Sequence, residues 1–344
     1  DMDITRRKLI GYLLSGAALS VSPFATHAAD ALLVPFGTLP PPQKAHRVLS
    51  AGAPADLLLL ALAPEMLLGL SSFDFSVSGS EFLSDTIRKL PKLGRLSGRA
   101  STLSLEKIVS LAPDIIIDCG SADETFRSLA QRTAAQTGVP YVLVDGKLRD
   151  SASQLRQVGA LLGVSSRAEK QAQLAERFLQ DAERFAQLSS NPPRFYSARG
   201  ATGLETGLQG SLHTEAAEQL GLINVASEPS QHGLAQVSFE QLLLWEPDII
   251  LTQDANTYRY ITQNGLWKNL QAVRKGQVLC YSGLPFGWLD SPPGINRLLG
   301  MRRLQAHFDG KIQANWMDDL QQFFRLFYHS DLNQTQLQRL LEAG

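Results

Sequence analysis

Three arginines beside glycine-rich stretches have the residue type and the setting for chemistry with anions. Arg95 and Arg99 lie in the segment 92–99, which contains two glycines, and Arg199 opens the segment 199–207, which contains three. Guanidinium groups bind carboxylate, catecholate and other oxyanion groups through paired hydrogen bonds. We therefore predict that these three arginines bind an anionic ligand. A solvated surface charge is the alternative for each.

Aromatic and amide side chains in other loops could complete such a site. Phe286 and Trp288 lie in an irregular stretch rich in glycine and proline, and Tyr258 or Tyr260 follows shortly after Gln253. Aromatic rings stack on flat organic ligands, and a few placed polar groups orient them. We predict ligand contacts for Phe286, Trp288, Tyr258 and Gln253. Packing inside the fold is the alternative for Trp288.

The histidines and cysteines show no metal-binding spacing. His213 and His232 do not form a His-x-x-x-His motif, and Cys119 and Cys280 stand alone in opposite halves of the chain. We expect His213 to cap a helix or to be solvated, with direct metal ligation as the weaker alternative. We expect both cysteines to be unpaired, with a bridge between the lobes as the alternative. Motifs of a phosphate-binding loop or of a nucleophilic serine are absent from the sequence. No catalytic residue is predicted.

Composition points to a soluble globular protein of two domains. The chain has 344 residues, of which 44% are hydrophobic and 19% charged. Lys and Arg number 32 against 33 Asp and Glu, which leaves a formal charge of -1. Such a balance gives no support for nucleic-acid binding, which relies on a basic surface.

The N-terminus has the features of an export signal. A basic segment with Arg6 and Arg7 precedes an apolar stretch from Leu9 to Val21, and small residues follow up to Ala28. The adjacent arginines favour the twin-arginine route over the Sec route. The apolar stretch is too short to span a bilayer, so we predict cleavage near Ala28 and a free periplasmic protein.

One sequence pattern occurs twice. Segments 103–117 and 237–251 align without a gap: a serine, a glutamate, apolar positions on one helical face, then Pro-Asp and a continuous apolar run. The serine caps a helix, the proline ends it, and the apolar run predicts a parallel strand covered on both faces. Two distant copies indicate two similar lobes rather than a solenoid.

The alternation of strand and helix patterns predicts an α/β fold. Two lobes, each with a central parallel β-sheet flanked by helices, are joined by one long α-helix. The predicted order is an export signal (1–28), a proline-rich linker (29–45), an N-terminal lobe (46–150), a connecting helix (151–190) and a C-terminal lobe (191–344). The C-terminal lobe ends in closing helices at about 295–308 and 316–341.

This layout and these motifs resemble a known family. Segments 105–117, 211–226, 237–243 and 286–300 are similar to periplasmic substrate-binding proteins of the helical-backbone class (class III). Those proteins serve ABC importers for chelated iron, haem, cobalamin and related ligands. The resemblance extends from His46 to about Phe308. Ser291 and Gly294 stand where the family more often has Arg and Ser, so this loop does not identify the ligand.

The resemblance implies capture of a chelated metal in a cleft between the lobes. A ferric siderophore, an Fe(III) chelate, is the first choice of ligand, and cobalamin, haem or an oxyanion such as molybdate are alternatives. No intrinsic cofactor is implied. The implied partner is an ABC permease dimer in the inner membrane, on which a monomeric binding protein docks through one glutamate per lobe. By motif position these are Glu106 and Glu240, for which a favourable place at a helix N-terminus is the alternative role.

Other classes of function also fit two lobes around a cleft. Chelatases and nitrogenase-type oxidoreductases share this architecture, and a fold alone does not decide function. Such enzymes need cofactor or cluster cysteines, or a cytoplasmic location, which this sequence does not suggest. A metal-chelate chaperone would have no use for Glu106 and Glu240. We therefore predict a transport protein and not an enzyme.

Overall fold

The computed structural model describes residues 31–76, 80–98, 100–229, 231–283 and 286–342. Residues 31–344 form one compact unit. The predicted export signal at 1–28 and the predicted ligand residue Arg99 lie outside the described residues. Within the described ranges, no helix is both long and apolar enough to cross a membrane.

The first lobe is built on a four-stranded sheet with the order β1-β4-β3-β2. Its strands are β1 (Leu33–Phe36), β2 (Val48–Ser50), β3 (Ile115–Gly120) and β4 (Tyr141–Asp145). Strands β2, β3 and β4 run parallel. Strand β3 is buried along its whole length, which is the environment that its continuous apolar run indicates.

Part of the segment 29–45, which was predicted to be a linker, is a strand, β1. It pairs antiparallel with β4 and forms the edge of the sheet. Proline has no amide hydrogen to donate, so Pro35 is tolerated in an edge strand such as this one. The proline content that suggested a loose linker is equally compatible with an edge strand.

The second lobe has a sheet with the order β10-β9-β5-β7, in which every pair is parallel. Its strands are β5 (Arg194–Ser197), β7 (Ile223–Asn224), β9 (Ile249–Thr252) and β10 (Val278–Cys280). A separate antiparallel pair consists of β6 (Glu205–Gly207) and β8 (Leu234–Gln236).

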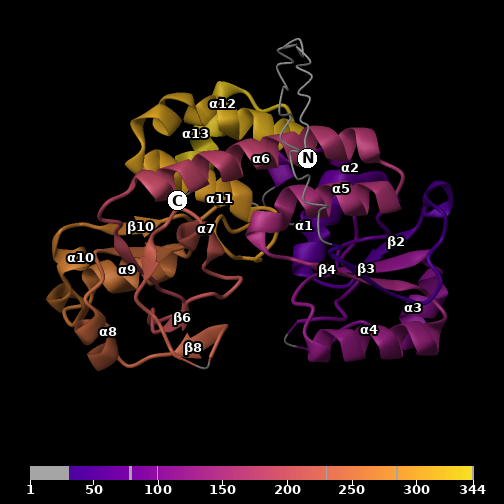
Figure 1. The fold of residues 1–344 in the computed structure, drawn as a ribbon, viewed down its shortest axis with the longest axis horizontal. Helices are drawn as coiled ribbons and strands as arrows, with labels where there is room; N and C mark the ends of the chain where they lie inside the picture. Colours follow the sequence, from indigo (N-terminus) through magenta and orange to yellow (C-terminus); the bar gives the residue numbers. More distant parts are fainter. Residues whose placement is uncertain (1–30, 77–79, 99, 230, 284–285, 343–344) are drawn as a thin grey trace, which may run out of the picture. The chain divides into compact units, whose positions relative to one another are not determined.

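Helices flank both sheets (Figure 1). The first lobe contains α1 (Ala53–Leu62), α2 (Asp85–Arg88), α3 (Leu105–Leu111) and α4 (Glu124–Thr137). The second lobe contains α7 (Glu215–Glu218), α8 (Phe239–Trp245), α9 (Ala255–Gln263) and α10 (Gln271–Arg274). Helix α1 is apolar and almost wholly buried, and it packs on β3.

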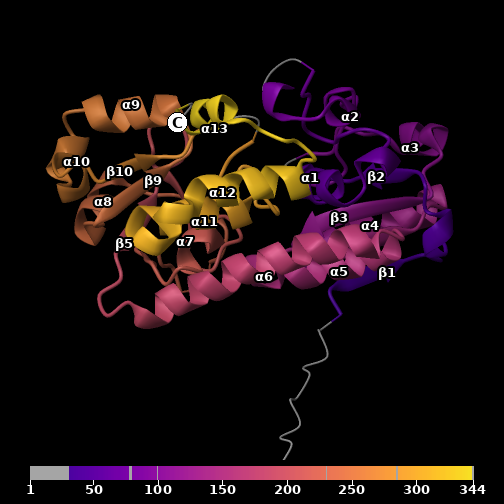
Figure 2. The same cartoon turned by 90° about the horizontal axis from the view of Figure 1, so that it is seen from above.

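Two helices lead from the first sheet to the second, the short α5 (Ser151–Leu161) and the long α6 (Ser165–Leu188). The buried face of α6 repeats every three or four residues, through Ala168, Ala172, Ala175 and Phe178. This face packs against α11 (Arg297–Phe308) and α12 (Gly310–Phe327), which Figure 2 shows beside it. The predicted α/β fold, with two sheets flanked by helices and joined by a long helix, is confirmed.

The end of the chain differs from the single helix predicted at about 316–341. Helix α12 ends at Phe327, and α13 begins at Gln334 and ends at Glu342. Between them His329 adopts a left-handed backbone conformation with φ 55°, which interrupts a helix. Its Nε2 atom lies 2.9 Å from the carbonyl oxygen of Leu60, so this turn is fastened to the C-terminal end of α1.

Candidate ligand-binding cleft

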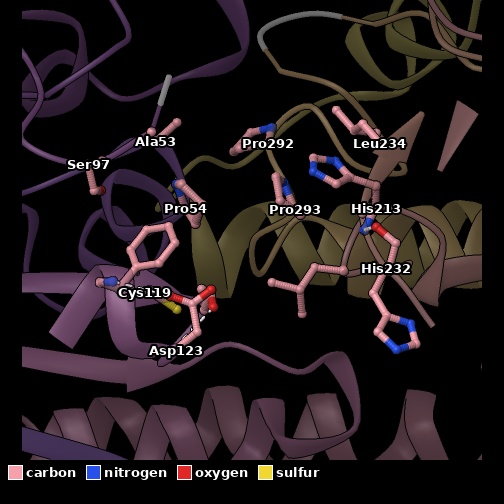
Figure 3. A pocket seen from close by; sticks show the side chains of 18 of the residues that line it. Ala53, Pro54, Ser97, Cys119, Asp123, His213, His232, Leu234, Pro292 and Pro293 are labelled. Atoms are coloured by element: carbon pink, nitrogen blue, oxygen red, sulfur yellow. Dashed lines mark hydrogen bonds between the residues drawn. The ribbon is translucent and has the colours of Figure 1, made fainter. Parts of the chain in front are cut away.

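A cleft of about 810 Å³ is lined by residues of both lobes. This volume lies within the usual range of roughly 300–1,000 Å³ for small-molecule sites. Figure 3 shows Ala53, Ser97 and Asp123 on one side and His213, His232 and Leu234 on the other, with Pro292 and Pro293 between them. Two loops of the first lobe that line it, 52–54 and 120–121, follow β2 and β3 directly, so they lie at the carboxyl ends of parallel strands. Ligands of open α/β sheets bind at this edge.

Two buried carboxylates support the wall of the cleft in the first lobe. Asp118 accepts hydrogen bonds from Ser97 Oγ, at 2.9 Å, and from Tyr141 Oη, at 3.0 Å. Asp56 accepts from the backbone amides of Ser71 and Ser72. Burial raises the pKa of each carboxyl to about 6. Because Ser72 and Ser97 line the cleft, these acids fix the positions of polar groups that face a ligand.

A close backbone approach occurs at Gly52, where the chain enters α1. A Cβ atom at this position would lie 2.6 Å from Ser97 Oγ. Only glycine allows the two loops to approach this closely without displacing the serine. Gly52 therefore helps to fix the wall that carries Ser97.

The wall of the second lobe carries a guanidinium group and an imidazole that share one carboxylate. Arg199 NH1 and His213 Nδ1 both contact Asp290 Oδ2, the imidazole at 2.8 Å. Asp290 is only 4% exposed and does not itself line the cleft, whereas Arg199 and His213 do. The guanidinium group of Arg199 also contacts Glu205 Oε1 at 3.3 Å.

The cleft does not supply a complete metal site within the described part of the chain. No group of three or more His, Cys, Asp or Glu residues there is arranged to hold a metal ion. Cys119 and Cys280 are free, as expected, and burial raises the pKa of the Cys119 thiol to about 12. A bare metal ion is therefore a poor match to these residues.

The sequence profile of the periplasmic binding protein family matches residues 59–282. The chain belongs to this family. Its fold is that of the class III solute-binding proteins of ABC transporters, in which a helix joins two α/β lobes.

Known proteins of the same kind match most of this periplasmic binding protein. The vitamin B12-binding protein of Vibrio cholerae is 27% identical over 243 residues, which are 68% of this chain and 83% of that protein. An ABC transporter solute-binding protein from Sulfurospirillum deleyianum has a TM-score of 0.78 at 25% identity, over 89% of this chain and 96% of that one. The molybdate periplasmic binding protein of Haemophilus influenzae shares the fold at 18% identity, with a TM-score of 0.66 over 86% and 96% of the two chains.

Two of the predicted ligand residues of this periplasmic binding protein line the cleft. Arg95 comes from the loop before α3 in the first lobe, and Arg199 from the turn after β5 in the second. The fold thus brings together two guanidinium groups that lie far apart in the sequence.

The other described candidates do not line the cleft. Trp288 is 5% exposed and packs against Trp316, with the Arg303 guanidinium over its ring, so the packing alternative holds in this structure. Phe286 packs on Tyr328, at 4.6 Å between ring centroids. Tyr258 lies on the exposed side of α9. Gln253 lies behind the wall of the second lobe, where it contacts Asp290.

Sequence reasoning gave too little weight to His213 and missed Asp290. Neither the helix cap nor the solvated residue expected for His213 describes its place, because its imidazole lines the cleft against a buried carboxylate. No local pattern marks Asp290, whose partners Arg199, His213 and Gln253 come from three distant segments. The only available signal was the position of Asp290 in segment 286–300, one of the segments that resemble the periplasmic substrate-binding proteins.

Glu106 and Glu240 occupy matching places on the two lobes. Each lies exposed in the first turn of its helix, α3 or α8. The preceding serines cap these helices in the same way, with Oγ accepting an amide hydrogen at 3.1 Å in both. The sequence repeat is therefore also a repeat of local structure.

Proposed function

We propose that this protein captures an anionic metal chelate in the cleft and delivers it to an ABC permease dimer. A ferric siderophore is our first choice of ligand. The observation that carries the proposal is the placing of Arg95 and Arg199 on opposite walls of one cleft, in a chain of the periplasmic binding protein family.

The wall of the first lobe supports an anionic ligand, while Arg199 on the opposite wall shares its charge with Asp290 and Glu205. Arg95 lines the cleft and forms no ion pair with another residue that the structure describes, so its guanidinium group is available to a carboxylate or catecholate. The one acidic residue lining the cleft in the described chain is Asp123, and its Oδ1 caps α4 by accepting from the amide of Phe126. The helix N-terminus offsets that negative charge.

The sparse aromatic lining favours a chelate over a large flat macrocycle. Among described residues, Phe126 is the only Phe, Tyr or Trp that lines the cleft. Cobalamin is nevertheless the second candidate, because the Vibrio cholerae relative is named for vitamin B12. Its binding would have to rely on contacts other than aromatic stacking.

The proposed role is binding without catalysis. The family and its structural neighbours are transport proteins. Cys119 lines the cleft, but burial keeps its thiol protonated, so it is a poor nucleophile.

Glu106 and Glu240 are proposed as the docking points for the two permease subunits. Two exposed carboxylates at equivalent places of two similar lobes fit a symmetric dimeric partner with basic pockets. We further propose that the protein acts as a monomer in the periplasm after removal of a signal peptide near Ala28.

The test is native mass spectrometry, with an absorption spectrum, of mature protein purified from iron-starved cells of its own source. A co-purified iron chelate with a charge-transfer band supports the proposal and identifies the cargo. A corrin spectrum favours cobalamin, and a porphyrin spectrum favours haem. Protein that arrives empty and then binds only a small oxyanion would contradict the chelate.

A further inference from the structure

Asp290 is a buried acid that collects hydrogen bonds from three separate segments of the second lobe. Its oxygens accept from Arg199 NH1 after β5, from His213 Nδ1 before α7 and from Gln253 Nε2 after β9. Its side chain is 3% exposed, so water does not compete for these bonds. The three donors also offset the cost of burying its charge.

Gln253 fixes the backbone that carries this acid. Its Oε1 atom accepts from the amide of Leu289 at 2.7 Å and from the amide of Asp290 at 3.0 Å, while its Nε2 donates to Asp290 Oδ1. One glutamine thus holds both the main chain and the carboxylate of Asp290. The carboxylate of Asp290 is therefore held in place, and it positions the side chains of Arg199 and His213.

The arrangement dictates which nitrogen of His213 carries hydrogen. A carboxylate is only an acceptor, so the Nδ1 atom at 2.8 Å must be the donor. In the neutral imidazole Nε2 is then unprotonated and carries a lone pair. His213 and Arg199 both line the cleft and both contact Asp290 Oδ2, so the imidazole and the guanidinium group share one anchor on the same wall.

We propose that Asp290 is a positioning residue for ligand selection, because it holds His213 as an electron-pair donor on the same cleft wall as Arg199. The ligand that fits this pair carries an anionic group for Arg199 and, beside it, an electron-pair acceptor for His213 Nε2. This inference rests on the proposed function and names the acceptor as the metal of the chelate. The described residues hold no metal site of their own, so the metal arrives with its chelator and needs only one ligand from the protein.

The binding step is a ligand exchange without redox change. The lone pair of His213 Nε2 forms a coordinate bond to the metal, the bond from the metal to one bound water breaks, and that water leaves. His213 keeps its Nδ1 proton throughout, in the hydrogen bond to Asp290 Oδ2.

The first test uses the free protein and does not depend on the ligand. Nitrogen-15 NMR of the histidine side chains at pH 8 should show His213 protonated on Nδ1 and unprotonated on Nε2. In Asp290→Asn a single amide oxygen replaces the two carboxylate oxygens that accept from Arg199, His213 and Gln253. The amide NH2 group is a donor and can face His213 Nδ1, so the nitrogen-15 signals of His213 should shift toward the tautomer protonated on Nε2. Asp254→Asn is the matched control, since Asp254 caps α9 on the same sheet edge and lies outside the cleft lining. A wild-type His213 protonated on Nε2 overturns the proposal.

The second test measures affinity by titration calorimetry with ferric nitrilotriacetate, which leaves coordination positions on iron open, and with the metal-free chelator. Loss of an outer partner of a metal-binding histidine typically weakens binding about 10- to 100-fold, and this is the expected effect of Asp290→Asn on the ferric probe. Asp254→Asn should bind like wild type. In a His213→Ala background, Asp290→Asn should have little further effect on the ferric probe.

The outcomes separate this inference from the proposed function. If wild type binds neither probe nor any co-purified chelate, the proposed function fails, and the NMR experiment still decides the role of Asp290. If wild type binds the ferric probe and Asp290→Asn binds it equally well, the inference fails and the function stands. Equal affinity for the metal-free chelator would show that the acceptor is a hydrogen-bond donor of the ligand, which overturns the assignment to metal.

Discussion

Arg297 on α11 and Glu215 at the start of α7 form a buried ion pair of 2.8 Å, and each of them also reaches the first lobe. Arg297 NH2 donates to the carbonyl oxygen of Gly146, and Glu215 Oε2 accepts from the amide of Leu148 at 3.3 Å. Burial is the main influence on both groups: it raises the pKa of Glu215 and lowers that of Arg297. The pair thereby connects the loop after β4 to the second lobe. Arg297 follows the cleft residues Pro292 and Pro293 closely in the sequence.

Glu215→Gln should destabilise the protein by about 3 kcal/mol, because it leaves the buried guanidinium of Arg297 without its counter-charge. Urea denaturation followed by tryptophan fluorescence measures this. The control is Asp331→Asn, which breaks an exposed pair with Arg325 and should cost less than about 1 kcal/mol. Equal losses in the two variants would contradict a special role for the buried pair.

Protonation of Asp118 should contribute to the pH dependence of the free energy of unfolding. Its pKa is raised to about 6 in the folded protein, above the roughly 3.9 of an unfolded chain, so the folded state binds more protons between these values. Stability from this group is therefore fully present below the unfolded pKa and lost as pH rises through about 6. When the pH falls from 7 to 4.5, the free energy of unfolding of wild type should rise by roughly 1–2 kcal/mol relative to that of Asp118→Asn. Denaturation at both pH values checks this, and a difference that does not vary with pH would rule it out.

Charge reversal at the two docking positions should separate transport from binding. Glu106→Lys together with Glu240→Lys should abolish uptake of the cargo by whole cells, because like charges would then face the basic pockets proposed for the permease. Affinity for the ligand in solution should not change, since neither residue lines the cleft. Glu124→Lys, an exposed glutamate in the first turn of α4, is the matched control and should transport normally. Reduced ligand affinity in the double variant would contradict the docking role.

Removal of a cleft arginine should weaken binding of an anionic chelate in a salt-dependent manner. Arg95→Gln keeps a polar side chain in the cleft but removes its charge. We expect the affinity to fall roughly tenfold, because one charge-assisted hydrogen bond is lost. Arg132→Gln on the exposed side of α4 should leave affinity unchanged. Titrations at low and high salt make the comparison, and identical affinities of both variants would exclude an anion contact at Arg95.

The sequence by itself determined the features that depend on neighbouring residues. The repeat predicted the serine caps of α3 and α8, the helix ends before Pro-Asp and the buried strands β3 and β9, because caps, proline and continuous apolar runs act within a few residues. It also predicted the two-sheet fold and a cleft between the lobes, and Arg95 and Arg199 line that cleft from opposite walls.

Only the tertiary structure decided which side chains face the cleft. The loop that carries Trp288 and Asp290 has no period from which the direction of a side chain follows, and in the structure the tryptophan enters the core while the acid supports the wall. The bonds of Asp290 to Arg199, His213 and Gln253 join segments that chain folding alone brings together. Such contacts leave no local pattern, because the residues that form them are neighbours in space and not in sequence.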